Sequence, residues 1–313
     1  MYLQVAAVEP VTVMRPSRAV ARDSEIIRQE NATWGLGSIS HRTPNSTEYL
    51  YGESAGEGTW AYVLDTGIYI EHEEFEGRAY LGYNGFPNLA FEDTDGHGTH
   101  CAGTIASRKY GAAKKANAID VKVFGDEDST SEIVINGFEW AVNNITAERR
   151  AGKSVISMSV SGPKSDAVNL ALRRAYVEQG ILTVAAAGSD GIRADLRSPA
   201  SELTAITVAA STKTNERALF SNWGSKVDLF AAGTNILSTY IGSPDASYVI
   251  SGTSMAAPHV SGLVLYLKAK ESGLEGAAAV TGCIIELATK EVLTGVPQET
   301  FNRLAFNSVQ LSY

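Results

Sequence analysis

Short apolar runs alternate with longer segments of helical periodicity through the middle of the chain. Short runs rich in Val, Ile and Ala are typical of buried strands, whereas apolar residues at every third or fourth position are typical of helices with one buried face. The pattern predicts strands near residues 61–64, 120–123, 154–159, 182–186 and 206–210. It predicts helices between them near residues 97–107, 133–148 and 165–179. This alternation is typical of an α/β fold with a mostly parallel central sheet and helices on both faces.

After residue 210 the pattern changes to short β segments separated by Gly and Asn turns. We expect these segments near Phe220 and over residues 227–230 and 248–250. One helix is expected to begin at Ser254, and a last helix is expected over residues 277–289. Residues 1–33 are polar and show little periodicity, and a disordered tail has the same pattern. We therefore predict an N-terminal lead over residues 1–33 and a single domain over residues 34–313.

Charge and composition narrow the classes of partner. The chain has 313 residues, of which 44% are hydrophobic, and its formal net charge is −9. A negatively charged protein is repelled by nucleic acid and by anionic membrane surfaces, and no apolar run approaches the roughly 20 residues that a membrane-spanning helix needs. We expect a monomer that binds neither nucleic acid nor a membrane.

Three polar residues occupy positions where catalytic residues are common. Asp65 directly follows a predicted buried strand, His97 lies among glycines at a predicted helix start, and Ser254 begins a predicted apolar helix. Each has an ordinary alternative, since aspartate is common in turns and serine is common at the N-terminus of helices. Together, in the order Asp, His, Ser, they match a catalytic triad. In such a triad the serine attacks a carbonyl, the imidazole takes its proton, and the carboxylate orients the imidazole.

The segments around these residues resemble the subtilases, a family of serine proteases. The matching segments are 61–67, 95–104 and 251–259, and the supporting segments 198–202, 220–225 and 236–239 are similar to those of the fungal proteinase K branch. The resemblance covers residues 34–313. It implies a subtilisin-like α/β fold and a serine endopeptidase that cleaves peptide bonds through an acyl-enzyme. It also implies Asp65, His97 and Ser254 as the triad, with no cofactor required for catalysis.

The site that stabilises the negatively charged intermediate departs from the family. Subtilases use an asparagine side chain here, whereas this chain has Ser189; the backbone N–H of Ser254 is the second donor that the resemblance implies. Loss of one such donor costs on the order of 10²–10³ in turnover. We therefore expect slow cleavage of generic peptides.

The substrate-binding edges have also changed relative to the family. The resemblance implies that an extended peptide pairs with Ser159-Val160-Ser161-Gly162, which replaces Ser-Leu-Gly-Gly. The opposite edge includes Ser129 and Thr130, and three acidic residues, 126–128, precede them. We expect either a preference for basic or small substrates or a groove that no longer accepts long peptides.

A structural calcium ion is implied at Asp228, together with backbone carbonyls near Leu203 and Ala205. A plain surface carboxylate is the alternative, because calcium sites use several oxygen ligands. The remaining polar candidates are assigned structural places: Cys101 as a buried small residue, His100 and His259 as buried histidines, and His41 and His72 as surface histidines.

The compartment remains open at this point. The resemblance implies an extracellular enzyme, and residues 5–13 resemble the last strand of an inhibitory propeptide. An intracellular location is the alternative, since the first residues lack a signal-peptide pattern and Trp60 and Ile206 replace two half-cystines of the relatives. The chain has two cysteines, Cys101 and Cys283, so it can form at most one disulfide.

Two other functions compete with the peptidase. The first is a biosynthetic enzyme that processes one dedicated small substrate or transfers its acyl group to an acceptor other than water. The second is a non-catalytic binding protein with a subtilase fold. The altered position at Ser189 favours the first, whereas retention of all three triad residues argues against the second.

Overall fold

A nine-stranded sheet forms the centre of the molecule. The computed structural model describes residues 25–125, 128–270, 274 and 276–309. The sheet order is β14-β15-β11-β10-β8-β6-β3-β5-β4, and all neighbouring pairs are parallel except β14 and β15. The strands are β3 (Trp60–Asp65), β4 (Ala79–Asn84), β5 (Asn117–Lys122), β6 (Ser154–Met158), β8 (Thr183–Ala186), β10 (Ile206–Ser211), β11 (Leu229–Ala232), β14 (Thr289–Lys290) and β15 (Arg303–Leu304). The predicted α/β class with a mostly parallel sheet is confirmed.

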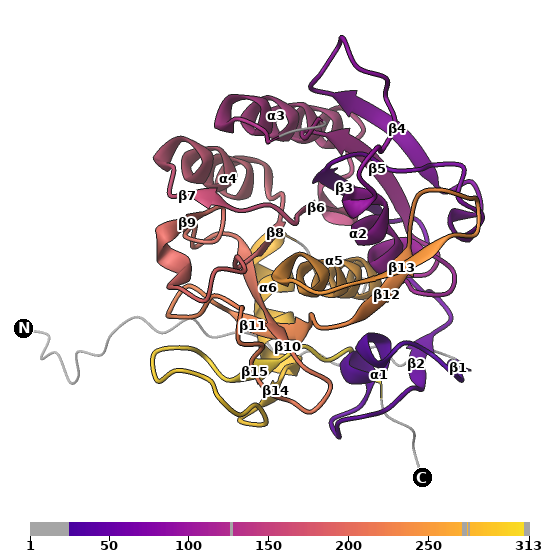
Figure 1. The fold of residues 1–313 in the computed structure, drawn as a ribbon, viewed down its shortest axis with the longest axis vertical. Helices are drawn as coiled ribbons and strands as arrows, with labels where there is room; N and C mark the ends of the chain where they lie inside the picture. Colours follow the sequence, from indigo (N-terminus) through magenta and orange to yellow (C-terminus); the bar gives the residue numbers. More distant parts are fainter. Residues whose placement is uncertain (1–24, 126–127, 271–273, 275, 310–313) are drawn as a thin grey trace, which may run out of the picture.

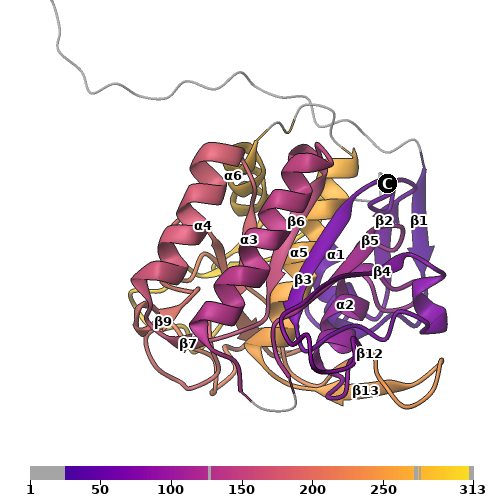
Figure 2. The same cartoon turned by 90° about the horizontal axis from the view of Figure 1, so that it is seen from above.

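Helices cover both faces of this sheet (Figures 1 and 2). Successive side chains of a strand point to opposite faces, so β3 supplies two cores. Ala61 and Val63 pack in the core beneath α2 (His97–Ala106) and α5 (Thr253–Lys270), whereas Tyr62 and Leu64 pack beneath α3 (Ser131–Ala147) and α4 (Asp166–Gln179). Strands buried on both faces explain why the sequence reads as short continuous apolar runs.

Three two-stranded sheets and two further helices surround this frame. They are β1 (Ile26–Gln29) with β2 (Tyr49–Gly52), β7 (Gly162–Pro163) with β9 (Arg197–Ser198), β12 (Ile236–Thr239) with β13 (Ser247–Ile250), α1 (Trp34–Ser40) and α6 (Ala277–Leu287). Thr130 caps α3 through its hydroxyl, and Gly180 ends α4 at a φ of 66°, a left-handed conformation that glycine adopts without strain. None of the helices in the described part of the chain is long and apolar enough to cross a membrane.

The structure changes several predicted elements. Phe220 lies in a turn and not in a strand. Part of the predicted N-terminal lead forms β1, which pairs with β2 along its whole length. The propeptide-like segment 5–13 lies outside the described residues.

Candidate active site

Asp65 and His97 meet at the carboxyl end of the central strands. Asp65 is the last residue of β3, and His97 is the first residue of α2. The Nδ1 atom of His97 lies 2.6 Å from Asp65 Oδ1. The helix can approach this closely because residue 98 is glycine: a Cβ there would collide with the carbonyl oxygen of Gly67. The glycines around His97 therefore serve close packing of the helix start against the turn that follows Asp65.

The environment of Asp65 fixes the tautomer of His97. The Asp65 carboxylate is buried, and its Oδ1 also accepts the backbone N–H of Thr66 at 2.8 Å. A carboxylate only accepts, so the neutral imidazole carries its proton on Nδ1 and presents Nε2 as a base. Burial lowers the pKa of His97, but the charge of Asp65 and, less strongly, Cys101 raise it, and the pKa lies well above its usual value.

Ser254 is the second residue of α5 and is held against the loop after β6. Its hydroxyl donates to the Ser159 carbonyl oxygen at 3.1 Å, and the Ser159 hydroxyl donates to the Ser254 carbonyl oxygen at 2.8 Å. The Cys101 thiol, on the His97 helix, donates to the same Ser254 carbonyl at 3.4 Å. Attack on a substrate requires the Ser254 hydroxyl to rotate from Ser159 to His97, a hydrogen bond that free enzymes commonly form only with substrate bound.

Ser189, the predicted oxyanion donor, contacts the first residue of α5, Thr253. Its Oγ accepts the Thr253 backbone N–H at 3.1 Å and lies 3.1 Å from Thr253 Oγ1. Thr253 Oγ1 in turn accepts the Gly188 backbone N–H at 3.1 Å. If Thr253 gives its hydroxyl hydrogen to Ser189, the hydrogen of Ser189 is left for a ligand. A serine side chain is shorter than that of asparagine, so its hydroxyl has less reach as a donor.

The predicted substrate edges enclose one cavity of about 360 Å³. One wall is Val160, Ser161 and Gly162, and the other includes Ser129 and Thr130. Asp128 also lines the cavity, whereas residues 126 and 127 lie outside the described part of the chain. Ser159 contacts Ser254 and does not line the cavity.

Cys101 adds a donor atom to the triad region but does not make a metal site. Atoms of Asp65, His97 and Cys101 lie within 4.8 Å of one another. His97 Nδ1 already donates to Asp65, and burial raises the pKa of the Cys101 thiol, which disfavours the thiolate that a metal needs. Cys101 and Cys283 are both thiols, so the single disulfide that the sequence allowed is not formed.

Asp228 directly precedes β11 and therefore lies at the amino ends of the strands, opposite the carboxyl ends where Asp65 and His97 meet. Its Oδ2 accepts the Thr207 backbone N–H at 2.8 Å. Burial raises the pKa of this carboxyl to about 6, although the Thr207 hydrogen bond and the nearby Arg303 and Lys226 charges act in the opposite direction. A carboxylate whose charge is incompletely compensated fits a bound cation, and the Leu203 and Ala205 carbonyls remain the other protein ligands that the resemblance implies.

The sequence analysis predicted buried or surface positions for the four histidines outside the triad, and the surface prediction for His72 was wrong. His72 is buried, and its Nε2 bonds to the Ala246 carbonyl at 2.7 Å, a partner 174 residues away. His41 is partly exposed beside Glu48. His100 and His259 are buried as predicted; they bond to the Ile236 and Met255 carbonyls, and burial lowers the pKa of each to about 4.

Two carboxylates behind the triad were missed. Asp93 is buried and accepts hydrogen bonds from Thr66 Oγ1, Gly96 N and both the N–H and hydroxyl of Thr99. Asp120 is buried on β5 and accepts the Ile68 N–H at 2.9 Å. The sequence did contain signals for both: Asp120 is an acid within an apolar strand, and Asp93 is an acid four residues before His97.

The chain is similar to proteins of one known family. A family model described as the subtilase family matches residues 56–301. This chain belongs to the subtilase family. "Alkaline protease 1" of Emericella nidulans is 56% identical over 279 residues, covering 89% of this chain and 68% of that protein. "Subtilisin-like proteinase Mp1" of Magnaporthiopsis poae is 54% identical over 289 residues, covering 90% and 71%.

A solved subtilase structure has the same fold. The crystal structure of a cold adapted subtilisin-like serine proteinase has a TM-score of 0.82 and 37% identity, and the match covers 90% of this chain and all of the solved chain. The predicted family is therefore confirmed, and the chain is a serine-type endopeptidase whose substrates are peptides or proteins. The dedicated biosynthetic enzyme and the non-catalytic binding protein are not favoured.

Proposed function

We propose that the endopeptidase works through an acyl-enzyme on Ser254. His97 Nε2 takes the Ser254 proton during attack on the peptide carbonyl and then gives it to the leaving amine. In the second half of the reaction His97 takes a proton from water, which attacks the acyl group, and returns that proton to the Ser254 oxygen as it leaves. Asp65 holds the imidazole in the required tautomer and stabilises its charged form. The observation that carries this proposal is the 2.6 Å contact between Asp65 and His97, with Ser254 on the adjoining helix start.

Two donors serve the oxyanion in this proposal. The Ser254 backbone N–H lies at the N-terminus of α5, where the helix dipole favours negative charge. The Ser189 hydroxyl supplies the second, weaker hydrogen bond. We accordingly propose slow turnover on generic peptides, because a donor that fails to reach the oxyanion gives little stabilisation to the transition state.

Residues before the cleaved bond pair with residues 159–162 in this account. The cavity of the groove is small and bordered by Asp128, which favours small or basic side chains over large or acidic ones directly within it. No cofactor is assigned a role in the reaction.

Cleavage in water enriched in ¹⁸O tests the proposed reaction directly. We expect mass spectrometry to show an ¹⁸O label at each newly formed C-terminus, with no product from Ser254→Ala. Products that carry an added amine in place of oxygen would instead establish acyl transfer.

The acid limb of the pH profile should report the state of His97. The base must be unprotonated, so kcat/KM is expected to rise with pH through a pKa well above 6.5 and to fall as the pH drops through it. Asp65→Asn removes the charge that raises this pKa, so the limb should move to lower pH while activity falls about 10²–10⁴-fold. A limb near pH 5 in the unaltered enzyme would contradict this account of His97.

We propose calcium binding at Asp228, with a pH signature. Calcium binds the folded protein through the ionised carboxylate and should raise the Tm at pH 8 relative to excess chelator. The folded-state pKa is about 6, so protonation should reduce this effect at pH 5. Thermal melts of the unaltered protein and of Asp228→Asn provide the measurement. Equal melting temperatures in calcium and chelator at pH 8, or an equal shift in Asp228→Asn, would remove calcium from Asp228.

A further inference from the structure

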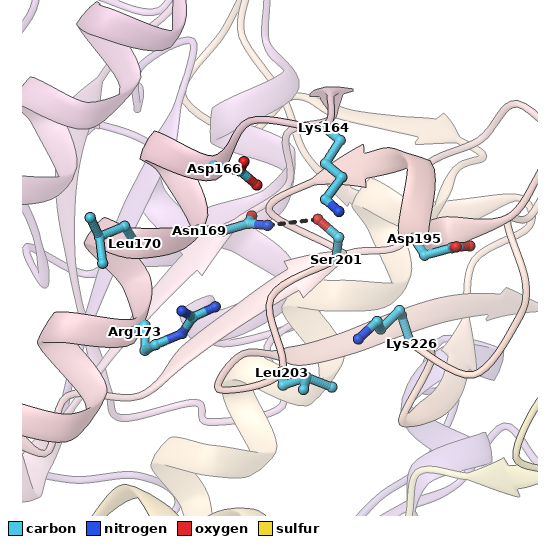
Figure 3. Close-up of a pocket in the computed structure, with 9 residues that line it drawn as sticks. All are labelled: Lys164, Asp166, Asn169, Leu170, Arg173, Asp195, Ser201, Leu203 and Lys226. Carbon is cyan, nitrogen blue, oxygen red and sulfur yellow. Dashed lines mark hydrogen bonds between the residues drawn. The ribbon is translucent and has the colours of Figure 1, made fainter.

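A second cavity, of about 520 Å³, lies beside the start of α4 and has not been given a role. Its volume falls in the range of ligand sites, roughly 300–1,000 Å³. Figure 3 shows the nine residues that line it: Lys164, Asp166, Asn169, Leu170, Arg173, Asp195, Ser201, Leu203 and Lys226. They come from the segment after β7, from α4, from the short helix Ala194–Leu196 and from the loops before β10 and β11.

Three cationic side chains converge on this cavity. In Figure 3 the ends of Lys164, Arg173 and Lys226 are directed into the space between their segments. No ion pair of Lys164 or Lys226 occurs within the described ranges. Arg173 bonds Glu202 through Nε and Nη2, at 3.4 and 2.8 Å, so that further guanidinium N–H donors remain for a ligand.

Acidic side chains also lie at and near this cavity, and two of them are bonded to arginines. Asp195 is bonded by Arg193 at 2.9 Å and points away from the cavity in Figure 3. The Arg173 charge is balanced by the buried Glu202. Lys164 and Lys226 face Asp166, which also lines the cavity, and the Lys226 charge acts in addition on Asp195 and Asp228. Neither lysine forms an ion pair within the described residues, so both ammonium groups keep donors for a ligand.

The floor of the cavity is polar and built from buried side chains. Asn169 is 6% exposed and Ser201 is 8% exposed, and the Asn169 amide donates to the Ser201 hydroxyl at 2.9 Å. The Ser198 hydroxyl donates to the side-chain oxygen Oδ1 of Asn169 at 2.8 Å. Because this network fixes the orientation of Asn169, its second amide hydrogen remains available for a ligand. Cations around a floor of donors favour a carboxylate or another oxyanion.

The cationic cavity adjoins the groove of the active site. Pro163 and Ser165 line the groove cavity, whereas Lys164 and Asp166 line the cationic one, so the two cavities lie on opposite sides of one segment. The contact between Ser254 and Ser159 places the cleaved bond beside Ser159. A peptide paired with the following residues advances about 3.3 Å per residue and reaches Lys164 about five residues before that bond.

We propose that this cavity is an exosite that binds acidic side chains of a protein substrate, five to seven residues before the cleaved bond. Lys164, Arg173 and Lys226 bind the carboxylates, and Asn169 donates from the floor. The inference rests on the proposed pairing of substrate with residues 159–162. It also separates two preferences along one substrate: small or basic side chains in the groove and acidic ones further upstream.

Two fluorescent peptides that differ only at positions five and six before the cleaved bond test the exosite. One carries two Glu residues there and the other carries two Gln residues. We expect Ser254→Ala protein to bind the Glu peptide about fivefold more tightly at low ionic strength, measured by fluorescence anisotropy. The preference should disappear in about 0.5 M NaCl and in Lys164→Gln/Lys226→Gln. The control Lys213→Gln/Lys290→Gln removes the same charge from exposed positions elsewhere and should retain the preference.

Equal binding of the two peptides, or a preference that survives in Lys164→Gln/Lys226→Gln, would overturn the proposal. Inorganic phosphate that binds the cavity without any preference for the Glu peptide would also overturn it and leave a simple anion site. Because the binding measurement uses Ser254→Ala protein, it does not depend on turnover. A Glu preference in binding together with no cleavage by the unaltered enzyme would support the exosite and contradict the proposed catalytic role of Ser254.

Discussion

Replacing Ser254 with alanine is expected to lower kcat on a cleavable peptide by about 10⁶-fold, because the nucleophile is lost while the fold remains. His97→Ala should cost a similar factor, and the double variant should be no slower than either single variant, since the two residues act as one unit. Peptide hydrolysis followed by mass spectrometry measures all three.

The control for this series is Ser225→Ala, which changes an exposed serine remote in sequence from the triad. Its activity should equal that of the unaltered enzyme. If the losses of Ser254→Ala and His97→Ala multiplied in the double variant, the two side chains would be acting independently, contrary to the proposed proton transfer between them.

Ser189→Asn is expected to raise kcat on generic peptides by up to about 10²-fold. The longer amide restores the donor that the family places at this position, and one such donor is worth about 2.7–4 kcal/mol in the transition state. The gain should appear in kcat more than in KM, because the donor meets charge that develops only during attack. The full gain is not expected, since Ser189 also accepts the Thr253 N–H, a bond that asparagine must replace.

Two companion variants make this prediction sharper. Ser189→Ala should lower kcat if the serine hydroxyl already donates to the oxyanion, and Ser225→Asn, which adds the same amide at an exposed turn, should leave activity unchanged. An unchanged kcat in Ser189→Asn would show that the oxyanion is bound by other groups. A loss of activity in Ser189→Asn would show that the Ser189–Thr253 contact matters more than the reach of the donor.

The proposed triad residues could be selected from the sequence because each lies in a short contiguous motif. Asp65 follows a buried strand, His97 begins a helix among glycines, and the apolar helix after Ser254 is written in the local pattern. The carboxyl ends of parallel strands lie at one edge of a sheet. Local pattern and topology together therefore brought Asp65 and His97 to one place.

Features that depend on distant partners could not be predicted in this way. β1 has a weak hydrophobic pattern and is defined by its pairing with β2, whose residues lie 20 to 26 positions later in the chain. His72 reads as a surface residue until Ala246 covers it. The cationic cavity needs Lys164, Arg173 and Lys226, which belong to three separate segments. No periodicity in the chain relates these positions, so only the folded structure shows that they converge.

Labelling with a fluorophosphonate tests the central claim most directly, because it detects an activated serine without assuming any substrate. We expect one covalent adduct per folded molecule, located on Ser254 by mass spectrometry of the digested protein. Labelling should be abolished in Ser254→Ala and strongly slowed in His97→Ala. A folded protein that takes up no label, or that is labelled on a different serine, would contradict the assignment of Ser254 as the nucleophile.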